Sequence, residues 1–497
     1  MIYTSTRDKS ISQGSAAAIV SGISKDGGLY VPTEIPKISR EFLDELVPMS
    51  YIERAKKVLS LYLTDFTAEE IAYCVEGAYK EGKFSSEKVA PLVTYNENAE
   101  ILELWRGPTC AFKDMALQLL PYLLTVSVKK TVSDKTIVIL VATSGDTGKA
   151  ALEGFKDVPG TKIMVFYPND GVSAMQKFQM ATQEGENVCV CAIEGNFDDA
   201  QNGVKKIFTD PAAHEKLEKN NMMFSSANSI NWGRLVPQIV YYVSAYCDLI
   251  SKGKIENGEK MNVVVPTGNF GNILAAYYAK MMGVPVGKLI CASNSNNVLT
   301  DFLETGRYNR NRTFYTTVSP SMDILISSNL ERLLYHITQS DETVKNLMED
   351  LSLKGEYTLD SETFGKISSL FFGGCCDDNE TKKTIEETYK KQGYLLDTHT
   401  AVAVKVYNDY VAQSGDMSPT VIASTANPYK FSAAVLNAVC DKSILGLDEF
   451  EQVEELISVT GAPCPPQLSG LKNKSVRFTE CCKKENMIDM VYKMLDI

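Results

Sequence analysis

Residues 135–148 read Lys-Thr-Ile-Val-Ile-Leu-Val-Ala-Thr-Ser-Gly-Asp-Thr-Gly. The first half is a nearly uninterrupted run of β-branched and aliphatic residues, which predicts a strand buried on both faces. The second half is a turn of small residues, and a helical pattern follows at 149–155. Strand, turn and helix in this order form the unit from which parallel sheets covered by helices are built. The stretch therefore predicts an α/β fold.

Further runs of the same kind follow along the chain, each ending in a Gly/Ser/Thr/Asn turn and a helical pattern. They lie at residues 162–167, 187–193, 261–265 and 420–424. Ligands of parallel sheets bind beyond the carboxyl ends of the strands. We therefore expect the turns after these runs to carry the chemistry.

The segments outside these runs have a different texture. Residues 1–90 contain amphipathic stretches at 50–63 and 68–81, which predict a mainly helical N-terminal domain. Charged helical patterns dominate between about 305 and 395, which predicts a helical insertion or cover. Residues 461–497 are expected to form a C-terminal extension that ends in a helix.

The bulk composition limits the class of protein. With 497 residues, 44% of them hydrophobic, the chain is long enough for two to four structural units at roughly 150 residues per domain. Its 50 Lys+Arg and 62 Asp+Glu give a net charge of -12, which disfavours nucleic acid as a main partner. Converging backbone N–H groups can still hold a small anionic substrate, because a local site need not follow the net charge.

Cysteine and histidine usage argues against a metal site. The 12 cysteines are scattered, and only three histidines are present: His214, His336 and His399. Because the short fixed spacing of zinc ligands is missing, we expect reduced thiols and no metal in a cytoplasmic protein. No apolar stretch reaches the ~20 residues that span a bilayer, so we expect a soluble protein that does not bind membranes.

The first candidate turn is Gly-Pro-Thr-Cys-Ala-Phe-Lys-Asp at 107–114, ahead of a helical run at 115–124. The positive end of the helix dipole and the apolar neighbour Phe112 are both expected to lower the pKa of Lys113. A partly neutral lysine is a nucleophile that can form a Schiff base with an aldehyde and move protons. The alternative is a solvated surface lysine.

The second turn, Thr-Ser-Gly-Asp-Thr-Gly at 143–148, joins a strand to a helix. Its small residues allow several backbone N–H groups to converge on a carboxylate or a phosphate. It is not a Walker motif, because the leading Gly is missing and Lys149 is followed by Ala150. A capped turn without a ligand is the alternative.

The third turn, Thr-Gly-Asn-Phe-Gly-Asn at 267–272, also joins a strand to a helix. Its two glycines permit close approach of the backbone to a phosphate. The first Gly of a dinucleotide fingerprint is absent, so one phosphate fits better than two. Taken alone, this turn is weak evidence for a ligand.

The fourth turn, Thr-Ala-Asn-Pro-Tyr-Lys at 425–430, follows the strand at 420–424. A hydroxyl at the end of a strand can hydrogen-bond a ring nitrogen of a ligand, or it can simply cap the next helix. Together the four turns offer a Schiff-base lysine, a carboxylate nest, a phosphate nest and a strand-end hydroxyl. These are the parts that a pyridoxal-phosphate site requires.

At these turns the sequence resembles the threonine synthases, with matches spread over most of the chain. The matching patterns lie at 26–32, 107–114, 142–148, 194–199, 228–234, 266–271, 319–323, 397–402 and 425–428. So many matches in order make chance implausible. The blocks at 194–199 and 228–234 look specific to the longer, bacterial and fungal type, whereas a lysine motif alone would fit several pyridoxal enzymes.

The resemblance implies a fold and a reaction. The fold is tryptophan-synthase-β-like, with two parallel-sheet α/β lobes over residues 91–460, the smaller at about 130–215, beside the N-terminal domain. The implied cofactor is pyridoxal 5′-phosphate. The implied activity is that of a carbon–oxygen lyase, which converts O-phospho-L-homoserine and water to L-threonine and phosphate by γ-elimination and β-addition. This is the last step of threonine biosynthesis.

Residue by residue, the resemblance assigns cofactor contacts. Lys113 is the Schiff-base lysine, Thr425 is the partner of the pyridine nitrogen, and Asp146 lies near the ring oxygen. The cofactor-phosphate loop comprises Gly268, Asn269, Phe270, Gly271 and Asn272. Two positions depart from the family pattern, since Cys110 replaces an aliphatic residue and Asn272 stands where many bacterial members have Asp.

The resemblance also assigns substrate contacts. The substrate carboxylate is expected at Ser144, Gly145, Thr147 and Gly148. We hypothesise that Arg234, with Ser229 and Asn231, helps to bind the leaving phosphate, because a guanidinium fork matches phosphate oxygens. His399 is expected to shape the start of its helix rather than to act in catalysis.

Two other functions fit parts of this pattern. One is another enzyme of the same cofactor fold, such as a serine or threonine dehydratase or a cysteine synthase. The other is a catalytically silent binding protein on the same scaffold, against which the presence of Lys113 and all four turns speaks. The sequence leaves monomer and homodimer equally open.

Overall fold

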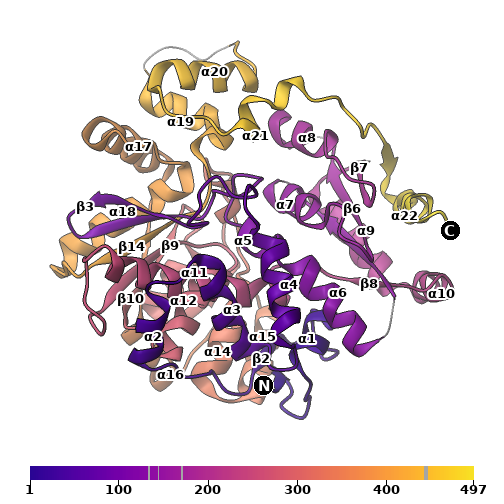
Figure 1. The fold of residues 1–497 in the computed structure, drawn as a ribbon, viewed down its shortest axis with the longest axis horizontal. Coiled ribbons are helices and arrows are strands. Elements are labelled where there is room, and N and C mark those ends of the chain that lie inside the picture. Colours follow the sequence, from indigo (N-terminus) through magenta and orange to yellow (C-terminus); the bar gives the residue numbers. More distant parts are fainter. Residues whose placement is uncertain (133–134, 144, 170–171, 441–445) are drawn as a thin grey trace.

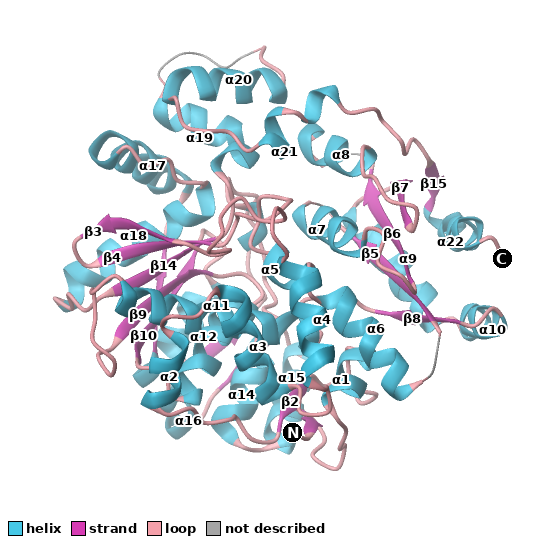
Figure 2. Cartoon of the chain, viewed as in Figure 1, coloured by secondary structure: helices cyan, strands magenta, loops and turns pink. Residues whose placement is uncertain are grey.

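Two sheets organise the chain, on either side of a central group of loops that includes the short helix α5 (Asp114–Leu117) (Figure 1, Figure 2). The computed structural model describes residues 1–132, 135–143, 145–169, 172–440 and 446–497. Segments far apart in the sequence meet in both sheets. The predicted two-lobed α/β fold is confirmed.

The larger sheet has six strands in the order β13-β10-β9-β14-β4-β3. Their bounds are β13 (Phe371–Cys375), β10 (Val286–Ser293), β9 (Met261–Pro266), β14 (Thr420–Ser424), β4 (Ala99–Glu103) and β3 (Leu92–Asn96). Neighbours are parallel except for the antiparallel pair β3 and β4. Every residue of β9 is buried, as expected for a strand with helices on both faces.

The alternation of side chains along β9 explains how two helices cover it. Val263 and Val265 pack on the face of α12 (Gly271–Met282), whereas Val264 packs on the other face with α18 (Thr398–Ser414). Successive side chains of a strand point to opposite faces, so one apolar run serves two layers of the core.

The smaller sheet has five parallel strands in the order β15-β7-β6-β5-β8. Their bounds are β15 (Cys481–Lys483), β7 (Val188–Glu194), β6 (Thr161–Pro168), β5 (Thr136–Ala142) and β8 (Met222–Ser225). One face carries α7 (Asp146–Phe155), and the other carries α9 (Phe197–Thr209) and α22 (Met487–Leu495). Helices α8 (Ala174–Ala181) and α10 (Pro211–Lys219) complete this lobe.

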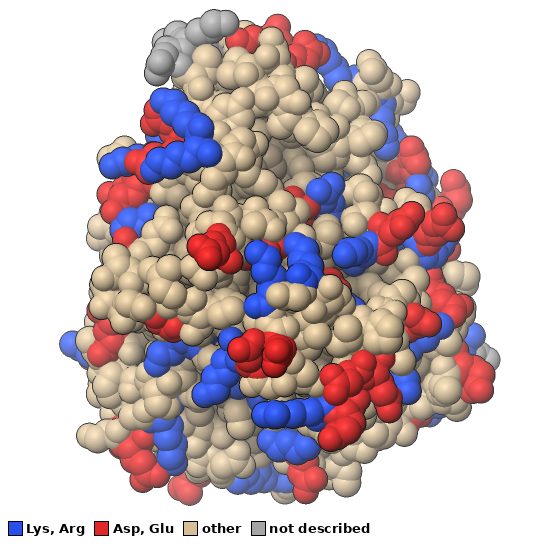
Figure 3. All heavy atoms as spheres, turned by 60° about the vertical axis from the view of Figure 1, so that its left-hand side comes forward, with Lys and Arg blue, Asp and Glu red and all other residues tan. Residues whose placement is uncertain are grey.

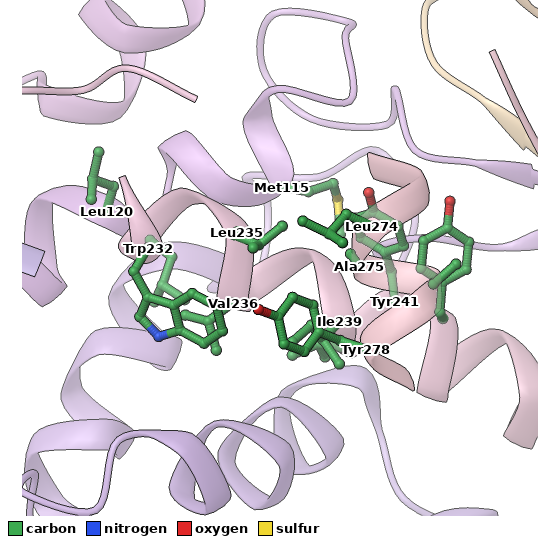
Figure 4. Packing of buried hydrophobic residues seen from close by; sticks show 14 of the residues in the cluster. Met115, Leu120, Trp232, Leu235, Val236, Ile239, Tyr241, Leu274, Ala275 and Tyr278 are labelled. Atoms are coloured by element: carbon green, nitrogen blue, oxygen red, sulfur yellow. The ribbon is translucent and has the colours of Figure 1, made fainter. Parts of the chain in front are cut away.

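The N-terminal helices pack against the long buried helix α11 (Trp232–Ser251). They are α1 (Ser15–Ser21), α2 (Arg40–Leu46) and α3 (Tyr51–Tyr62), together with α6 (Leu120–Thr131), while α4 (Ala68–Tyr79) packs on α3 and α6. Ser50 and Thr67 begin α3 and α4 with capping boxes, each cap contributing about 1 kcal/mol. Trp232 lies near Tyr278 at the centre of this packing (Figure 4), with ring centroids 5.5 Å apart.

The region 305–395 is not wholly helical. It contains α14 (Leu330–Thr338), α15 (Asp341–Leu353), α16 (Ser361–Leu370) and α17 (Asp378–Gln392), but also the antiparallel pair β11 (Arg307–Asn309) and β12 (Glu356–Thr358). Its strand β13 forms an edge of the larger sheet. Two glycines weaken the strand signal of β13, and a Cβ at Gly373 would lie 3.1 Å from Cα of Thr300 in α13 (Val298–Thr305). Close packing of α13 on the strand therefore explains one of these glycines.

The C-terminal part returns to the smaller sheet. After α19 (Ser432–Val439), α20 (Glu449–Thr460) and α21 (Pro466–Ser469), the chain adds the edge strand β15 and ends in α22. The C-terminal end thus lies at the smaller sheet, as Figure 1 shows at its right-hand side.

Charged side chains of both signs lie on the face of the molecule drawn in Figure 3. On the face drawn in Figure 3, Lys and Arg side chains are interspersed with Asp and Glu. None of the twelve cysteines forms a disulfide bond. Within the described ranges, no helix is long and apolar enough to cross a membrane, and no cluster of His, Cys, Asp and Glu could hold a metal ion.

Candidate active site

Lys113 stands at the N-cap of α5, at the end of a tightly fixed loop. Cys110 in this loop has a left-handed φ of 58°, which is uncommon for a residue other than glycine. The Asp114 carboxylate accepts hydrogen bonds from the backbone N–H and the hydroxyl of Thr109, at 2.8 and 2.7 Å, and closes the turn. The loop therefore presents the lysine from a rigid base.

The loop of Lys113 is bound to the loop that follows β14. The N–H of Phe112 donates to the carbonyl of Thr425 at 2.8 Å, and the N–H of Asn427 donates to the carbonyl of Cys110 at 3.0 Å. Thr425 is 6% exposed, and its hydroxyl has no hydrogen-bond partner among the described residues. Asn427 caps the next helical turn by accepting from the N–H of Tyr429, so the alternative capping role does not fall to Thr425.

The side chain of Lys113 reaches toward the other lobe. Its Nζ lies 4.0 Å from Oδ2 of Asp146, at the start of α7, and 3.4 Å from the hydroxyl of Ser321. Burial lowers the pKa of Lys113; the Asp146 carboxylate opposes this shift, and the charges of Lys430 and Arg234 add to it. The lysine is 13% exposed. Its setting differs from that of a solvated surface lysine.

Asp146 is buried and ionised. Burial alone would raise its pKa, but the ammonium groups of Lys430 and Lys113 outweigh burial and hold this pKa well below its usual range. Nζ of Lys430 lies 2.8 Å from Oδ1 of Asp146. Lys430 was not among the residues expected at the site, although it ends the fourth turn of the sequence.

The turn at 143–148 satisfies part of its own backbone. Ser144 lies outside the described residues. The hydroxyl of Thr143 accepts from the N–H groups of Gly145 and Gly148, at 3.0 and 3.1 Å. The N–H groups of Asp146 and Thr147 have no acceptor in the described part of the chain. These two donors are therefore the open ones at the start of α7.

Gln176 of α8 covers this turn and is a further residue that the sequence did not indicate. A Cβ at Gly145 would lie only 2.9 Å from its Nε2, and Nε2 lies 3.5 Å from Oδ1 of Asp146. The contact places the end of the flexible Gln176 side chain directly over Gly145. The only signal in the sequence was a polar residue near the start of the next helix, which is too common to single one out.

The loop at 267–272 has the shape of a phosphate cradle. It follows β9, and Phe270 adopts a left-handed φ of 62° at the N-cap of α12. A Cβ at Gly268 would lie 2.8 Å from the carbonyl oxygen of Ser321. The carbonyl of Gly268 accepts from the hydroxyl of Ser327, and that of Asn269 from the N–H of Asn329. These contacts fix the loop from the segment that follows β11.

Asn272 provides a test of whether an anion fits this cradle. Its Oδ1 accepts from the hydroxyls of Tyr241 and Tyr242, at 2.7 and 2.5 Å. Its Nδ2 is buried without a partner. An unpaired buried donor at a helix N-terminus suits a phosphate group, because the amide and the helix dipole both favour negative charge.

Arg234, near the start of α11, is buried without a counter-ion. It is 4% exposed, donates from Nη1 to the carbonyl of Ala227 at 2.9 Å, and leaves Nε without a partner. Burial lowers its pKa to about 10, and no carboxylate among the described residues pairs with it. A buried guanidinium of this kind can bind an anionic substrate.

Ser229 and Asn231, expected to bind the leaving phosphate with Arg234, differ in how many hydrogen bonds their side chains already make. The amide of Asn231 is fully engaged: Oδ1 caps the N–H of Gly233, and Nδ2 donates to the carbonyls of Ile19 and Ser226. Asn231 thus holds the start of α11 in place, and a role for it at the leaving phosphate stays a prediction. Within the described part of the chain, the hydroxyl of Ser229 donates to Oδ1 of Asn228, at 3.3 Å.

His399 is held at both ring nitrogens. Nδ1 lies 3.0 Å from Oδ1 of Asp397, the N-cap of α18, and Nε2 accepts from the N–H of Ser321 at 3.1 Å. Nδ1 therefore carries the ring proton. This arrangement connects the start of α18 to the Ser321 segment beside Lys113.

Comparison with known proteins adds to this geometry. Three family models match the chain: "Threonine synthase N terminus" at residues 2–79, "Pyridoxal-phosphate dependent enzyme" at 90–363 and "Threonine synthase, C-terminal" at 400–491. Threonine synthase-like 1 of Pongo abelii is 43% identical over 438 residues, covering 86% of this chain and 58% of that protein. The chain thus spans a little over half the length of that relative.

Other relatives match over nearly their whole length. Threonine synthase of Pseudomonas aeruginosa is 38% identical, and the match covers 88% of this chain and 90% of that protein. The crystal structure of threonine synthase from Brucella melitensis with bound PLP has a TM-score of 0.88 and 37% identity. The match covers 100% of this chain and 99% of that one.

Proposed function

Because the chain belongs to the threonine synthase family of pyridoxal-phosphate-dependent enzymes, we propose that it converts O-phospho-L-homoserine and water to L-threonine and phosphate. Its cofactor is pyridoxal 5′-phosphate. The reaction would be a γ-elimination of phosphate followed by addition of water at Cβ. It would complete threonine biosynthesis.

The proposed cofactor contacts come from both sides of the site. Lys113 would hold the cofactor covalently, and the loop from Gly268 to Asn272 would hold its phosphate through backbone N–H groups and the unpaired Nδ2 of Asn272. The free hydroxyl of Thr425 would face the ring nitrogen. When bound, the cofactor supplies an electron sink for the carbanion chemistry.

The proposed substrate contacts bind its two anionic ends. The open N–H groups of Asp146 and Thr147 would hold the carboxylate, with Gln176 covering the turn. Arg234 would hold the phosphate. Once released from the cofactor, Nζ of Lys113 would accept the α proton of the substrate, for which its lowered pKa favours the neutral amine.

The observation that carries this proposal is the uncompensated buried guanidinium of Arg234 near Lys113. Its charge is close enough to lower the pKa of Lys113, and no carboxylate of the described chain neutralises it. An amino-acid substrate that also bears a phosphate would supply the missing negative charge. Serine or threonine carries only the carboxylate, which we assign to the turn at 143–148, and would leave Arg234 without a counter-ion.

The proposal is tested by two measurements on the purified chain. Release of inorganic phosphate from O-phosphohomoserine, with formation of threonine, is expected. Formation of pyruvate from serine or of 2-ketobutyrate from threonine as the main activity would instead indicate a dehydratase. Borohydride reduction followed by peptide mapping should place a phosphopyridoxyl label on Lys113, and the Lys113→Ala chain is the control.

A further inference from the structure

Two lysines from different parts of the chain share the Asp146 carboxylate. Nζ of Lys430 lies 2.8 Å from its Oδ1, whereas Nζ of Lys113 lies 4.0 Å from its Oδ2. Asp146 begins α7 in the smaller lobe, while Lys430 lies in the 3-10 turn η2 (Pro428–Phe431), which follows β14 of the larger sheet. The carboxylate is therefore hydrogen-bonded by Lys430 and only approached by Lys113.

Lys430 is fixed in a way that Lys113 is not. Its Nζ donates to Asp146 and also to the carbonyl of Thr109, at 2.8 Å. Its side chain is 2% exposed, against 13% for Lys113. The hydroxyl of Ser321, at 3.4 Å, is the hydrogen-bond partner of Lys113. Lys430 is thus the anchored cation of the pair, and Lys113 is the movable amine.

The charged groups that face Lys113 indicate how Lys430, the anchored cation, affects its protonation. Asp146 is the nearest anion, and the cations are Lys430 and Arg234. Burial raises the pKa of Asp114 to about 7, and Thr109 engages its carboxyl. His399 also lies on this side of the site, where its Nε2 accepts from the N–H of Ser321. Among the described residues, Asp146 is therefore the main anion that could hold Lys113 as an ammonium ion, and Asp114 adds a smaller attraction where it is ionised.

An opposite charge within about 4–6 Å favours the charged form of a lysine, and a like charge disfavours it. Lys430 acts on Lys113 in both ways, because it neutralises Asp146 and adds a second positive charge. We propose that Lys430 is a positioning residue of the active site, which occupies Asp146 and so leaves the amine of Lys113 free to act as nucleophile and base. This role rests on the proposed function in one respect, because the proposed function makes Lys113 the nucleophile and base.

A purely structural role for Lys430 makes different predictions. Through the carbonyl of Thr109, Lys430 also ties down the loop that carries Lys113. Loss of that tie would lower the melting temperature and loosen the loop. Loss of the tie would not by itself change the pH at which Lys113 loses its proton. Removing the charge of Asp146 would not restore the melting temperature or tighten the loop.

The experiment measures the protonation of Lys113 directly. The full chain is freed of cofactor and labelled with trace acetic anhydride between pH 6 and 10, and acetylation of Lys113 is quantified by peptide mapping. In Lys430→Met, the midpoint for Lys113 is expected to rise by at least one pH unit, so that labelling near pH 7 falls at least tenfold. Lys430→Arg should keep the midpoint close to that of the natural chain.

Two further variants protect the test against a folding failure. Asp146→Asn alone should lower the midpoint of Lys113, because the attracting anion is lost and Lys430 remains. The double variant Lys430→Met with Asp146→Asn should return the midpoint to within half a unit of the natural value. An unchanged midpoint in Lys430→Met, or in Asp146→Asn if the first variant does not fold, overturns the proposal.

The labelling needs neither cofactor nor substrate, so the two proposals fail separately. A natural chain that releases no phosphate from O-phosphohomoserine overturns the proposed function. The midpoints of the variants still decide whether Lys430 sets the protonation of Lys113.

Discussion

The N–H of Phe112 donates a hydrogen bond to the carbonyl oxygen of Thr425, at 2.8 Å. The residue next to the candidate cofactor lysine is thereby fixed to the residue whose hydroxyl we assign to the ring nitrogen. The contact uses the backbone of Thr425 and leaves its side chain free. Substitutions of this side chain can therefore test the hydroxyl without releasing the lysine loop.

Thr425→Val is expected to bind the cofactor but to lower kcat/KM about 10- to 100-fold. Valine has the shape of threonine without the hydroxyl, and loss of one partner in a buried hydrogen bond costs about 1–3 kcal/mol. Thr425→Ser keeps the hydroxyl and should lose less than tenfold. Steady-state phosphate release is the measurement. Equal losses in the two variants would show that the methyl group matters and the hydroxyl does not.

Gly268→Ala is expected to weaken cofactor binding at least tenfold and to lower the melting temperature of the cofactor-free chain. The added Cβ would lie 2.8 Å from the carbonyl oxygen of Ser321, so the loop must shift at a cost of about 1–3 kcal/mol. Gly271→Ala is the matched control for stability, since its Cβ would lie 3.4 Å from Nδ2 of Asn329. If both variants melt like the natural chain, Gly268 is not needed for this packing.

Arg234→Gln is expected to raise KM for O-phosphohomoserine and to lower kcat/KM about 10- to 100-fold. Hydrogen bonds to charged groups contribute about 1.5–3 kcal/mol, and glutamine retains only one polar group without charge. Inorganic phosphate should inhibit the natural enzyme competitively and this variant at least tenfold more weakly. An Arg234→Gln enzyme with unchanged KM, kcat and phosphate inhibition would remove Arg234 from the substrate site.

His399→Asn is expected to lower kcat by less than tenfold. Both ring nitrogens are engaged, Nδ1 with Asp397 and Nε2 with the N–H of Ser321, so the ring has no free site for proton transfer. Asparagine can retain one of these contacts. A thousandfold loss of kcat, with cofactor binding intact, would identify His399 as a catalytic residue.

The strands of the two sheets were predictable where the sequence is most apolar. The expected runs at 135–142, 187–193 and 420–424 correspond to β5 (Thr136–Ala142), β7 (Val188–Glu194) and β14 (Thr420–Ser424). Such strands are buried on both faces, so local composition determines them. The three-residue strand β15 was not predicted, because a strand so short is recognised only by the partner that it meets.

Part of the candidate site was also predictable from the apolar strands. Its turns follow buried strands, so the sequence indicated where Lys113 and the loop at 267–272 would lie. It could not indicate that Lys430 pairs with Asp146, since that contact joins distant segments from two lobes. Nor could it show that Asn231 uses Oδ1 to cap α11 and Nδ2 to bind two backbone carbonyls, because capping and ligand binding require the same residue type.

His336 makes stability depend on pH in a direction that the structure determines. Burial, assisted by the charge of Arg332, lowers its pKa to about 3, and the hydroxyl of Tyr278 lies 2.7 Å from its Nε2. In the unfolded chain a histidine has a pKa of about 6.5. Between these two values the unfolded state binds a proton that the folded state does not, so stability falls as the pH is lowered from about 6.5 toward 3.

His336→Gln removes the group that binds this proton in the unfolded chain, and its amide oxygen can still accept from the hydroxyl of Tyr278. The free energy of unfolding of both proteins is measured by urea denaturation at each pH. From pH 7 to pH 5 it is expected to fall by about 1–2 kcal/mol less in the variant than in the natural chain. His214→Gln, on α10, controls for the loss of a histidine at an exposed position. Because the folded state excludes the proton, the difference must grow as the pH falls. A difference that is constant with pH would mean that His336 contributes packing alone.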